Sequence, residues 1–228
     1  KDRFTVEHLK ETAPALYEAN KAEKPGSFLF LEPVTGLDGT KLSDAQTAWA
    51  RERLARAGLA DRAEFRIEDY RDHRGSYDGV ASIEMVEAVG EHWLDVYFER
   101  CNALLAPHGS MLLQAITIRD QHYEQALRTV DFIQRHVFPG SFMPCVAALA
   151  ERVARRTDMT IVHLEDIGPH YARTLREWRK RFLARRDQVR ALGYSDEFQR
   201  TWEYYLAYCE GGFEERARHM IAIAPEAL

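Results

Sequence analysis

The sequence predicts an α/β protein in which a parallel β-sheet carries helices on both faces. Two apolar runs, DGVASI over residues 78–83 and MLLQAITI over residues 111–118, lack polar alternation, which indicates strands buried on both faces. Between them, residues 93–105 carry apolar side chains at helical spacing. A strand, a helix and a strand in this order form a βαβ unit, and its repetition gives a parallel sheet.

Length, charge and cysteine content narrow the class of protein. At 228 residues, with 46% hydrophobic and 29% charged side chains, the chain is long enough for one well-buried domain with an added cap. The net charge of -5 argues against bulk attraction to nucleic acid. Three widely spaced cysteines without CxxC spacing indicate neither a disulfide framework nor a zinc site, and they suit a reducing cytoplasm. We see no apolar run that could span a bilayer and no signal peptide.

The first third of the chain predicts short elements separated by turn residues. In order, they are a mildly helical segment over 1–25, the strand fragments SFLFL and VTGL within 27–37, a helix over 43–57 and an alternating strand over 63–67. Ser43 and Gln46 have the spacing of a capping box at the start of that helix, and Gly58 ends it.

The remaining chain predicts helices and strands in alternation after a turn at Pro107 and Gly109. The expected elements are helices over 123–137 and 145–157 joined by the turn FPGSFMP, a strand over 160–167, helices over 172–191 and 196–210, and a strand within 216–224.

Two acidic residues, Glu84 and Glu87, follow the end of the strand over 78–83. Ligands of open α/β sheets bind at the carboxyl ends of the strands, so a carboxylate there is in a position to do chemistry. An alternative role for Glu87 is a carboxylate near the N-terminus of a helix, where the helix dipole favours negative charge.

Several stretches occur in the order known from one enzyme family. They are VTGL, LSDAQTAWARERL, EFRIEDYRD, SIEMVEAVGE, LLQAITI, DFIQRHVFPG, GPHYARTLREW and YYLAYCEGGF. From Val34 onward the chain therefore resembles the cyclopropane fatty acid synthases and mycolic acid cyclopropane synthases, which are S-adenosylmethionine-dependent methyltransferases. The resemblance implies a Rossmann-like class I methyltransferase sheet of seven strands with helical cap insertions over an acyl pocket. It divides the chain into an unassigned segment over 1–33 and a methyltransferase domain over 34–228, with the cap at about 119–158 and 172–212.

The resemblance also implies a reaction and a catalytic site. A methyl group passes from the cofactor to a carbon of an unsaturated fatty acyl chain, usually in a phospholipid, and the resulting cation must lose a proton. Family members hold a bicarbonate ion with a glutamate, a histidine, a tyrosine and backbone groups. These positions match Glu87, Tyr171 and the backbone of Ile116, but Gln114 occupies the histidine position. A glutamine amide can donate a hydrogen bond but cannot carry positive charge, which raises the alternative of methyl-branched or methylene-branched products.

For the cofactor, the resemblance implies contacts from two stretches: Gly36, Leu42, Ser43 and Gln46, and then Glu68, Asp69 and Tyr70. A capping box explains Ser43 and Gln46 equally well, and acidic residues are common in loops after strands. No glycine-rich cofactor turn precedes VTGL, and the two residues between SFLFL and VTGL cannot make a parallel crossover. Either a strand, its glycine loop and a helix are missing, with a chain break between Leu31 and Leu42, or the cofactor domain is incomplete.

Two further patterns bear on the lipid substrate. Residues 173–190 carry eight basic side chains and an apolar stripe, which suits a helix on an anionic membrane but equally a solvated helix packed by that stripe. The aromatic residues near the C-terminus either line the acyl pocket or pack in the core: Tyr204, Tyr205, Tyr208 and Phe213. We therefore expect a cytoplasmic lipid methyltransferase with peripheral contact at the inner membrane face. A catalytically silent acyl-binding relative and a small-molecule O- or N-methyltransferase stay open as alternatives.

Overall fold

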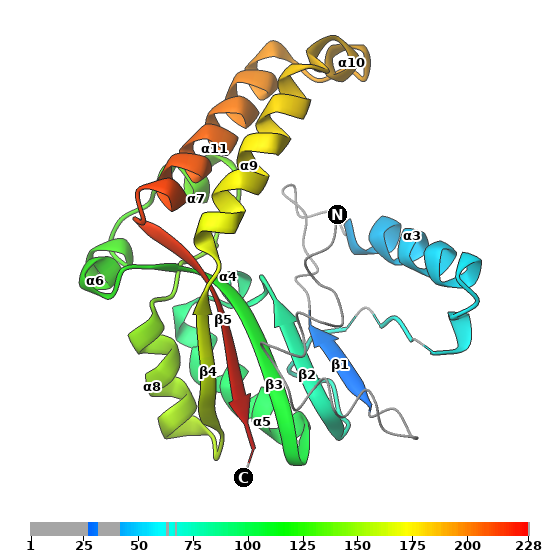
Figure 1. Ribbon diagram of the computed structural model, residues 1–228, viewed down its shortest axis with the longest axis vertical. Coiled ribbons are helices and arrows are strands. Elements are labelled where there is room, and N and C mark those ends of the chain that lie inside the picture. Colours follow the sequence, from blue (N-terminus) through cyan, green and yellow to red (C-terminus); the bar gives the residue numbers. More distant parts are fainter. Residues whose placement is uncertain (1–26, 32–41, 63, 67, 228) are drawn as a thin grey trace.

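The protein is described from a computed structural model, which covers residues 27–31, 42–62, 64–66 and 68–227. Within these residues five strands form one sheet in the order β1-β2-β3-β5-β4 (Figure 1). The strands are β1 Phe28–Leu31, β2 Tyr77–Ile83, β3 Leu105–Ile118, β4 Thr160–Asp166 and β5 Arg218–Glu226. The two apolar runs that predict the central strands thus lie side by side, with Val80 opposite Met111.

The sheet is mixed, which corrects the prediction of a wholly parallel sheet. Strands β1, β2 and β3 are parallel, whereas β5 runs antiparallel to both β3 and β4. After β4 the chain rises into a pair of long helices and returns to the same edge of the sheet, so β5 enters from the edge at which β4 ended (Figure 1). A parallel β5 would need the chain to return to the opposite edge first.

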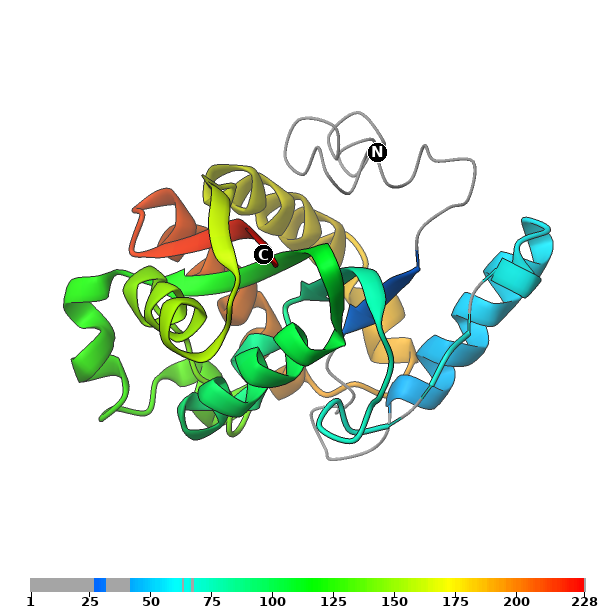
Figure 2. The same cartoon turned by 90° about the horizontal axis from the view of Figure 1, so that it is seen from below.

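Helices form around this sheet with the bounds that follow. They are α3 Leu42–Arg56, η1 Ala60–Arg62, α4 Val86–Val89, η2 Glu91–Trp93, α5 Leu94–Leu104, η3 Asp120–His122, α6 Tyr123–Ala126, α7 Phe132–His136, α8 Val146–Arg156, α9 Gly168–Leu183, α10 Arg186–Ala191 and α11 Asp196–Glu214. Helices α5 and α8 lie together on one face of the sheet (Figure 2). There, Phe98 and Leu149 pack on Met111 and Leu113 in the largest buried cluster.

Side chains of β3 alternate between the two faces of the sheet, as the pleat requires. Leu112 points away from α5 and packs with Ala81, Ile83 and Ala222. Nearer the carboxyl end of β3, Ile116 packs in the cluster formed by α9 and α11. Described helices therefore cover one face, while α9 and α11 contact only the carboxyl end of the second face, on which Val162 and Leu164 of β4 are exposed.

Helices α9 and α11 form an antiparallel hairpin above the carboxyl edge of the parallel strands, with α10 near its tip (Figure 1). The hairpin begins at Gly168, which lies so close to β5 that an added Cβ would come within 3.3 Å of the backbone nitrogen of Met220. Between the two helices, Glu210 near the end of α11 accepts hydrogen bonds from Arg176 at 2.8 Å and from Arg179 at 2.9 Å. A glycine at the base and a buried acid between the helices thus fix the position of the hairpin.

Three predicted elements differ from the structure. The helix expected over 123–137 is divided into α6 and α7, because Asp131 forms a capping box with Gln134 and pairs through its other oxygen with Arg218 at 2.9 Å. The helix expected over 172–191 is interrupted between α9 and α10. The strand expected over 63–67 is wrong for residues 64–66, where Arg66 pairs with Glu64 and the Phe65 carbonyl accepts a hydrogen bond from a side chain of α3.

The other predicted elements that fall on described residues are confirmed, and the turn at 107–109 forms an irregularity within β3. The helix over 1–25, the VTGL fragment, Gly36 and the break between Leu31 and Leu42 concern residues outside the described part. Within the described residues the sheet has five strands, and the strand expected over 63–67 is not among them. Among the described helices, none combines the length and the apolar composition that a transmembrane span requires.

Candidate functional site

Glu84 follows β2 directly and takes an unusual backbone conformation. Its φ angle is 51°, in the left-handed region that side-chain-bearing residues rarely adopt. The backbone nitrogen of Glu84 donates a hydrogen bond to the carbonyl of Gln114 at 3.0 Å, so it continues the pairing of β2 with β3. The unusual turn therefore sits on a fixed strand end, where it can aim the carboxylate.

Gln114 is buried on β3 and fixes the carboxylate of Glu84. Its side-chain nitrogen Nε2 donates to Glu84 Oε1 at 3.2 Å and lies 3.6 Å from the Met220 sulfur. Because both backbone and side chain of Gln114 bond to Glu84, these two residues act as one structural unit. The register that places Gln114 opposite Ile83 brings them together.

Glu87 lies in the short helix α4, one turn after Glu84. Its Oε1 accepts a hydrogen bond from the backbone nitrogen of Ile116 at 2.6 Å, while its Oε2 is buried and has no hydrogen-bond partner among the described residues. Burial raises the pKa of Glu87 to about 7; the bond from Ile116 opposes this rise, and the nearby charge of Glu84 adds to it. Glu87 can therefore exchange a proton near neutral pH.

Tyr171 enters the site from the first turn of α9. Its ring packs edge-on against Phe213, with ring centroids 5.1 Å apart, and against Trp178 at 6.1 Å. Burial, followed by the nearby charge of Glu84, raises the pKa of Tyr171 far above its usual range, so the phenol stays neutral. It can donate a hydrogen bond and present a π face to positive charge.

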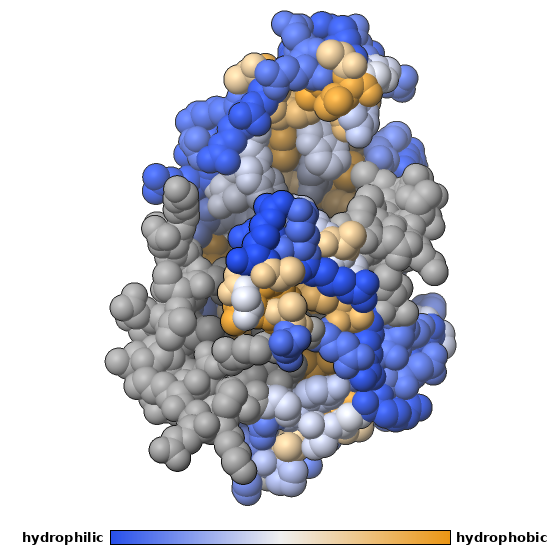
Figure 3. Space-filling view, turned by 90° about the vertical axis from the view of Figure 1, so that its right-hand side faces the viewer, coloured by the Kyte–Doolittle hydropathy of each residue, from blue (hydrophilic) through white to orange (hydrophobic). Residues whose placement is uncertain are grey.

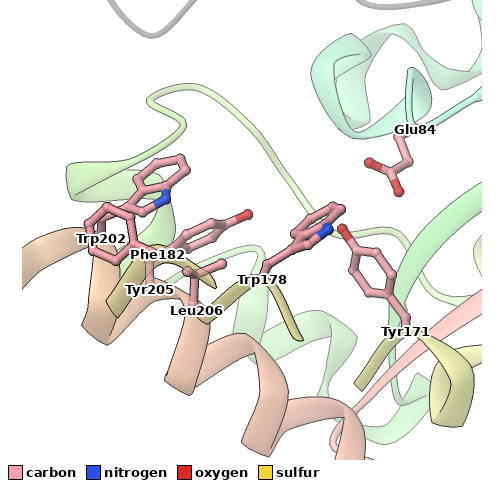
Figure 4. Close-up of a pocket in the computed structure, with 7 residues that line it drawn as sticks. All are labelled: Glu84, Tyr171, Trp178, Phe182, Trp202, Tyr205 and Leu206. Carbon is pink, nitrogen blue, oxygen red and sulfur yellow. The ribbon is translucent and has the colours of Figure 1, made fainter. Parts of the chain in front are cut away.

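A pocket of about 410 Å³ lies between this edge of the sheet and the hairpin. Its lining residues are Glu84, Tyr171, Trp178, Phe182, Trp202, Tyr205 and Leu206 (Figure 4). The carboxylate of Glu84 and the hydroxyl of Tyr171 point toward one another at one end, and the large apolar side chains of α9 and α11 occupy the other. Seen from the side of α3, the molecule shows apolar surface set back behind hydrophilic outer residues (Figure 3). Such a cavity suits a long apolar ligand whose reactive part meets one carboxylate.

The loop over 68–70 holds the second group of predicted cofactor residues. Glu68 pairs with His73, whose other ring nitrogen lies 2.8 Å from the Tyr77 hydroxyl. Asp69 accepts hydrogen bonds from the backbone and side chain of Arg71, which lower its pKa to about 2.

Tyr70 places this loop near the strand ends, because it packs edge-on against Tyr97, which in turn donates to the Ser82 hydroxyl at 2.7 Å. Gly36 and the side chains of Leu42, Ser43 and Gln46 lie outside the described part of the chain.

The structure brings Glu87 and Ile116 into direct contact, joins Gln114 to Glu84 by a hydrogen bond, and places Tyr171 in the same pocket as Glu84. The sequence indicates Glu84 as an acid at a strand end, but neither Glu84 nor most of the apolar wall is among the predicted site residues. The signal for that wall was the spacing of Trp178 with Phe182 and of Trp202 with Leu206, four residues apart in each helix.

Of the four aromatic residues considered near the C-terminus, Tyr205 lines the pocket and Phe213 packs against Tyr171. Tyr204 and Tyr208 instead stack on each other on a more exposed side of α11.

Comparison with known proteins gives consistent results. A family model described as mycolic acid cyclopropane synthetase matches residues 34–223. The chain is 42% identical over 172 residues to tuberculostearic acid methyltransferase from Mycobacterium tuberculosis, covering 75% of this chain and 40% of that protein. It is 31% identical over 178 residues to cyclopropane-fatty-acyl-phospholipid synthase from Escherichia coli, covering 78% and 44%. The chain thus spans less than half the length of these relatives.

Among solved structures, a mycolic acid cyclopropane synthase complexed with SAH and CTAB has a TM-score of 0.71. The match covers 97% of this chain and 83% of that one at 21% sequence identity. This likeness confirms the Rossmann-like α/β fold expected from the sequence.

Proposed function

Because the chain belongs to the mycolic acid cyclopropane synthetase family, we propose that it is part of an S-adenosylmethionine-dependent C-methyltransferase that acts on unsaturated fatty acyl chains. The observation that carries this proposal is the pocket itself. Six of its seven lining residues are aromatic or aliphatic side chains of one helical hairpin, and the seventh is the carboxylate of Glu84. An acyl chain fits such a wall, and the carboxylate would stand beside its reacting carbons.

When bound, S-adenosylmethionine would supply an electrophilic methyl group. The proposed contacts are Gly36, Leu42, Ser43, Gln46, Glu68, Asp69 and Tyr70. Support comes from the loop over 68–70, which Tyr70 anchors near the carboxyl end of β2 through its contact with Tyr97. This is the edge at which open α/β sheets bind their ligands.

The catalytic site proposed here contains Glu87, Gln114, Tyr171 and the backbone of Ile116. Transfer of that methyl group to an alkene carbon, with release of the cofactor's sulfur as a neutral thioether, would leave a cation on the acyl chain. The π face of Tyr171 and the two nearby acidic side chains favour positive charge in this pocket. Ile116 holds one oxygen of Glu87, and Gln114 holds one oxygen of Glu84. Two acids fixed beside one apolar pocket suit a reaction that makes a cation and then removes a proton.

Bicarbonate, which the family resemblance suggests as a further component, does not fit these residues. The backbone nitrogen of Ile116 already donates to Glu87, and the side-chain amide of Gln114 already donates to Glu84. None of the residues lining the pocket is basic. An added anion would face two carboxylates without a positive charge to offset them, so we derive no step through bicarbonate.

The substrate proposed is an unsaturated phospholipid or free fatty acyl chain, reached by peripheral contact with the inner membrane face. Most basic side chains of residues 173–190 are paired with acids of the hairpin, including Arg186 with Glu203 and Arg190 with Asp196. We therefore expect contact at the hairpin tip, where Leu192 is 77% exposed and Tyr194 is 49% exposed. Exposed apolar and aromatic side chains of this kind suit insertion into the surface of a lipid bilayer.

The direct test is mass spectrometry of lipids from cells that express the full-length protein. We expect unsaturated acyl chains to be replaced by chains that carry one additional carbon, as a ring or a branch. Unchanged acyl chains would contradict the proposal. Calorimetric titration with S-adenosylmethionine tests the alternative of a catalytically silent relative, for which we expect no heat of binding. Methylated small molecules with unchanged lipids would favour the O- or N-methyltransferase alternative.

A further inference from the structure

Glu84 is the charged residue among those that line the pocket, and packing alone does not explain its backbone conformation. Its backbone occupies the left-handed region with φ at 51°, a conformation that persists only where the surroundings impose it. A glycine would adopt this turn without strain. A glutamate at this position therefore points to a role for the carboxylate.

The two oxygens of the Glu84 carboxylate differ in their surroundings. Oε1 accepts the hydrogen bond from Gln114 at 3.2 Å, while no described residue donates a hydrogen bond to Oε2. Tyr171 and the apolar wall of the pocket face the same carboxylate (Figure 4). One oxygen is thus anchored and the other is left for a ligand or a proton.

We propose that Glu84 is the base of the reaction and takes the place of an external anion, with Gln114 as its positioning residue. The inference rests on the proposed function. After methyl transfer, a C–H bond of the new methyl group breaks and its proton passes to the carboxylate of Glu84. The electron pair of that bond closes a cyclopropane ring or, after a hydride shift along the chain, forms a methylene group. Charge balances, because the cation on the acyl chain and the carboxylate both become neutral.

Glu84 suits this role better than Glu87. Each acid has one oxygen that accepts a hydrogen bond, but the other oxygen of Glu87 is buried and Glu87 is not part of the pocket lining, whereas Glu84 is. The titratable groups that face Glu84 are Glu87 from α4, Tyr171 from α9 and Tyr205 from α11. None of them is a cation, and burial raises the pKa of Glu84 against the opposing effect of Gln114. A base in such surroundings accepts a proton more readily than an exposed carboxylate.

The first test compares turnover of full-length variants on vesicles of unsaturated phospholipid. Loss of a general base should lower kcat of Glu84→Gln by about 100-fold to 10,000-fold, with little change in KM. Glu84→Asp should retain more activity. The matched control is Glu99→Gln on α5, an exposed carboxylate outside the pocket, which should behave as wild type. A Glu84→Gln variant within about threefold of an active wild type would overturn the inference alone, whereas an inactive wild type would overturn the proposed function with it.

A second test uses binding and rescue. Glu84→Gly should fold, because glycine suits the backbone angle, and it leaves room for a small anion. We expect formate to restore part of its activity and to leave the wild type unaffected. Carbon-13 NMR with labelled bicarbonate should detect binding to Glu84→Gly and none to the wild type. Saturable binding of bicarbonate to the wild type, weakened in Gln114→Ala, would overturn the inference.

Discussion

Replacing Glu87 with glutamine should stabilise the protein, and by an amount that depends on pH. The folded protein raises the pKa of Glu87 from 4.5 to about 7, mainly through burial. The folded state therefore favours the protonated carboxyl group, and wild-type stability should fall as pH rises from 4.5 to about 7. Glutamine cannot ionise, and its side-chain oxygen can still accept the hydrogen bond from Ile116.

The pKa gives the size of this effect. A difference of 1 between the pKa values in the folded and unfolded states is worth about 1.36 kcal/mol. Ionisation of Glu87 therefore lowers the free energy of unfolding by about 3 kcal/mol in full. Part of it is already present at pH 5. We therefore expect the stability advantage of Glu87→Gln over wild type to grow by about 2 to 3 kcal/mol between pH 5 and pH 8.

Urea unfolding of both proteins at several pH values measures this difference directly. Glu99→Gln serves as the control, because Glu99 is exposed and its replacement should give no such trend. An advantage of Glu87→Gln that is constant across this pH range would refute the reasoning, since it would mean that Glu87 ionises at the same pH in the folded and unfolded chains.

Three further predictions follow from the same geometry. Glu84→Gly should be more stable to urea than Glu84→Ala by about 1 kcal/mol, because only glycine adopts the positive φ angle without strain; equal stability would argue against that backbone conformation. Trp178→Ala should raise KM for acyl substrate about tenfold or more by removing apolar contact, whereas Tyr204→Ala, on the same hairpin but outside the pocket, should leave KM unchanged in steady-state assays. Leu192→Glu should weaken sedimentation with anionic vesicles, and unchanged binding would exclude the hairpin tip as the membrane contact.

The sequence predicted the central βαβ unit well because uninterrupted apolar runs leave few alternatives for a buried strand. The direction of β5 was harder to predict from the sequence. The composition of β5 is that of any buried strand, and its antiparallel course depends on the edge from which the chain enters after α11. The break between α6 and α7 was hidden for a similar reason, since Asp131 forms its ion pair with Arg218, which is 87 residues away in the chain.

The candidate site, like the fold, could be predicted from the sequence only in part. The resemblance implied Glu87, Gln114, Ile116 and Tyr171, and the structure shows that Ile116 contacts Glu87 whereas Gln114 and Tyr171 lie beside Glu84. The pairing of Gln114 with Glu84 joins residues 30 apart through the register of β2 and β3, which the sequence does not state. The apolar wall required the antiparallel packing of α9 against α11, which brings Trp178 and Trp202 to one pocket.

The central claim is that a proton is removed from a methyl group newly attached to an acyl chain. Its most direct test supplies the full-length enzyme with S-adenosylmethionine whose transferable methyl group carries three deuterons, together with unsaturated phospholipid, and follows the acyl product by mass spectrometry. We predict that the product retains two of the three deuterons. Retention of all three, as in transfer of an intact methyl group to oxygen or nitrogen, would contradict the account.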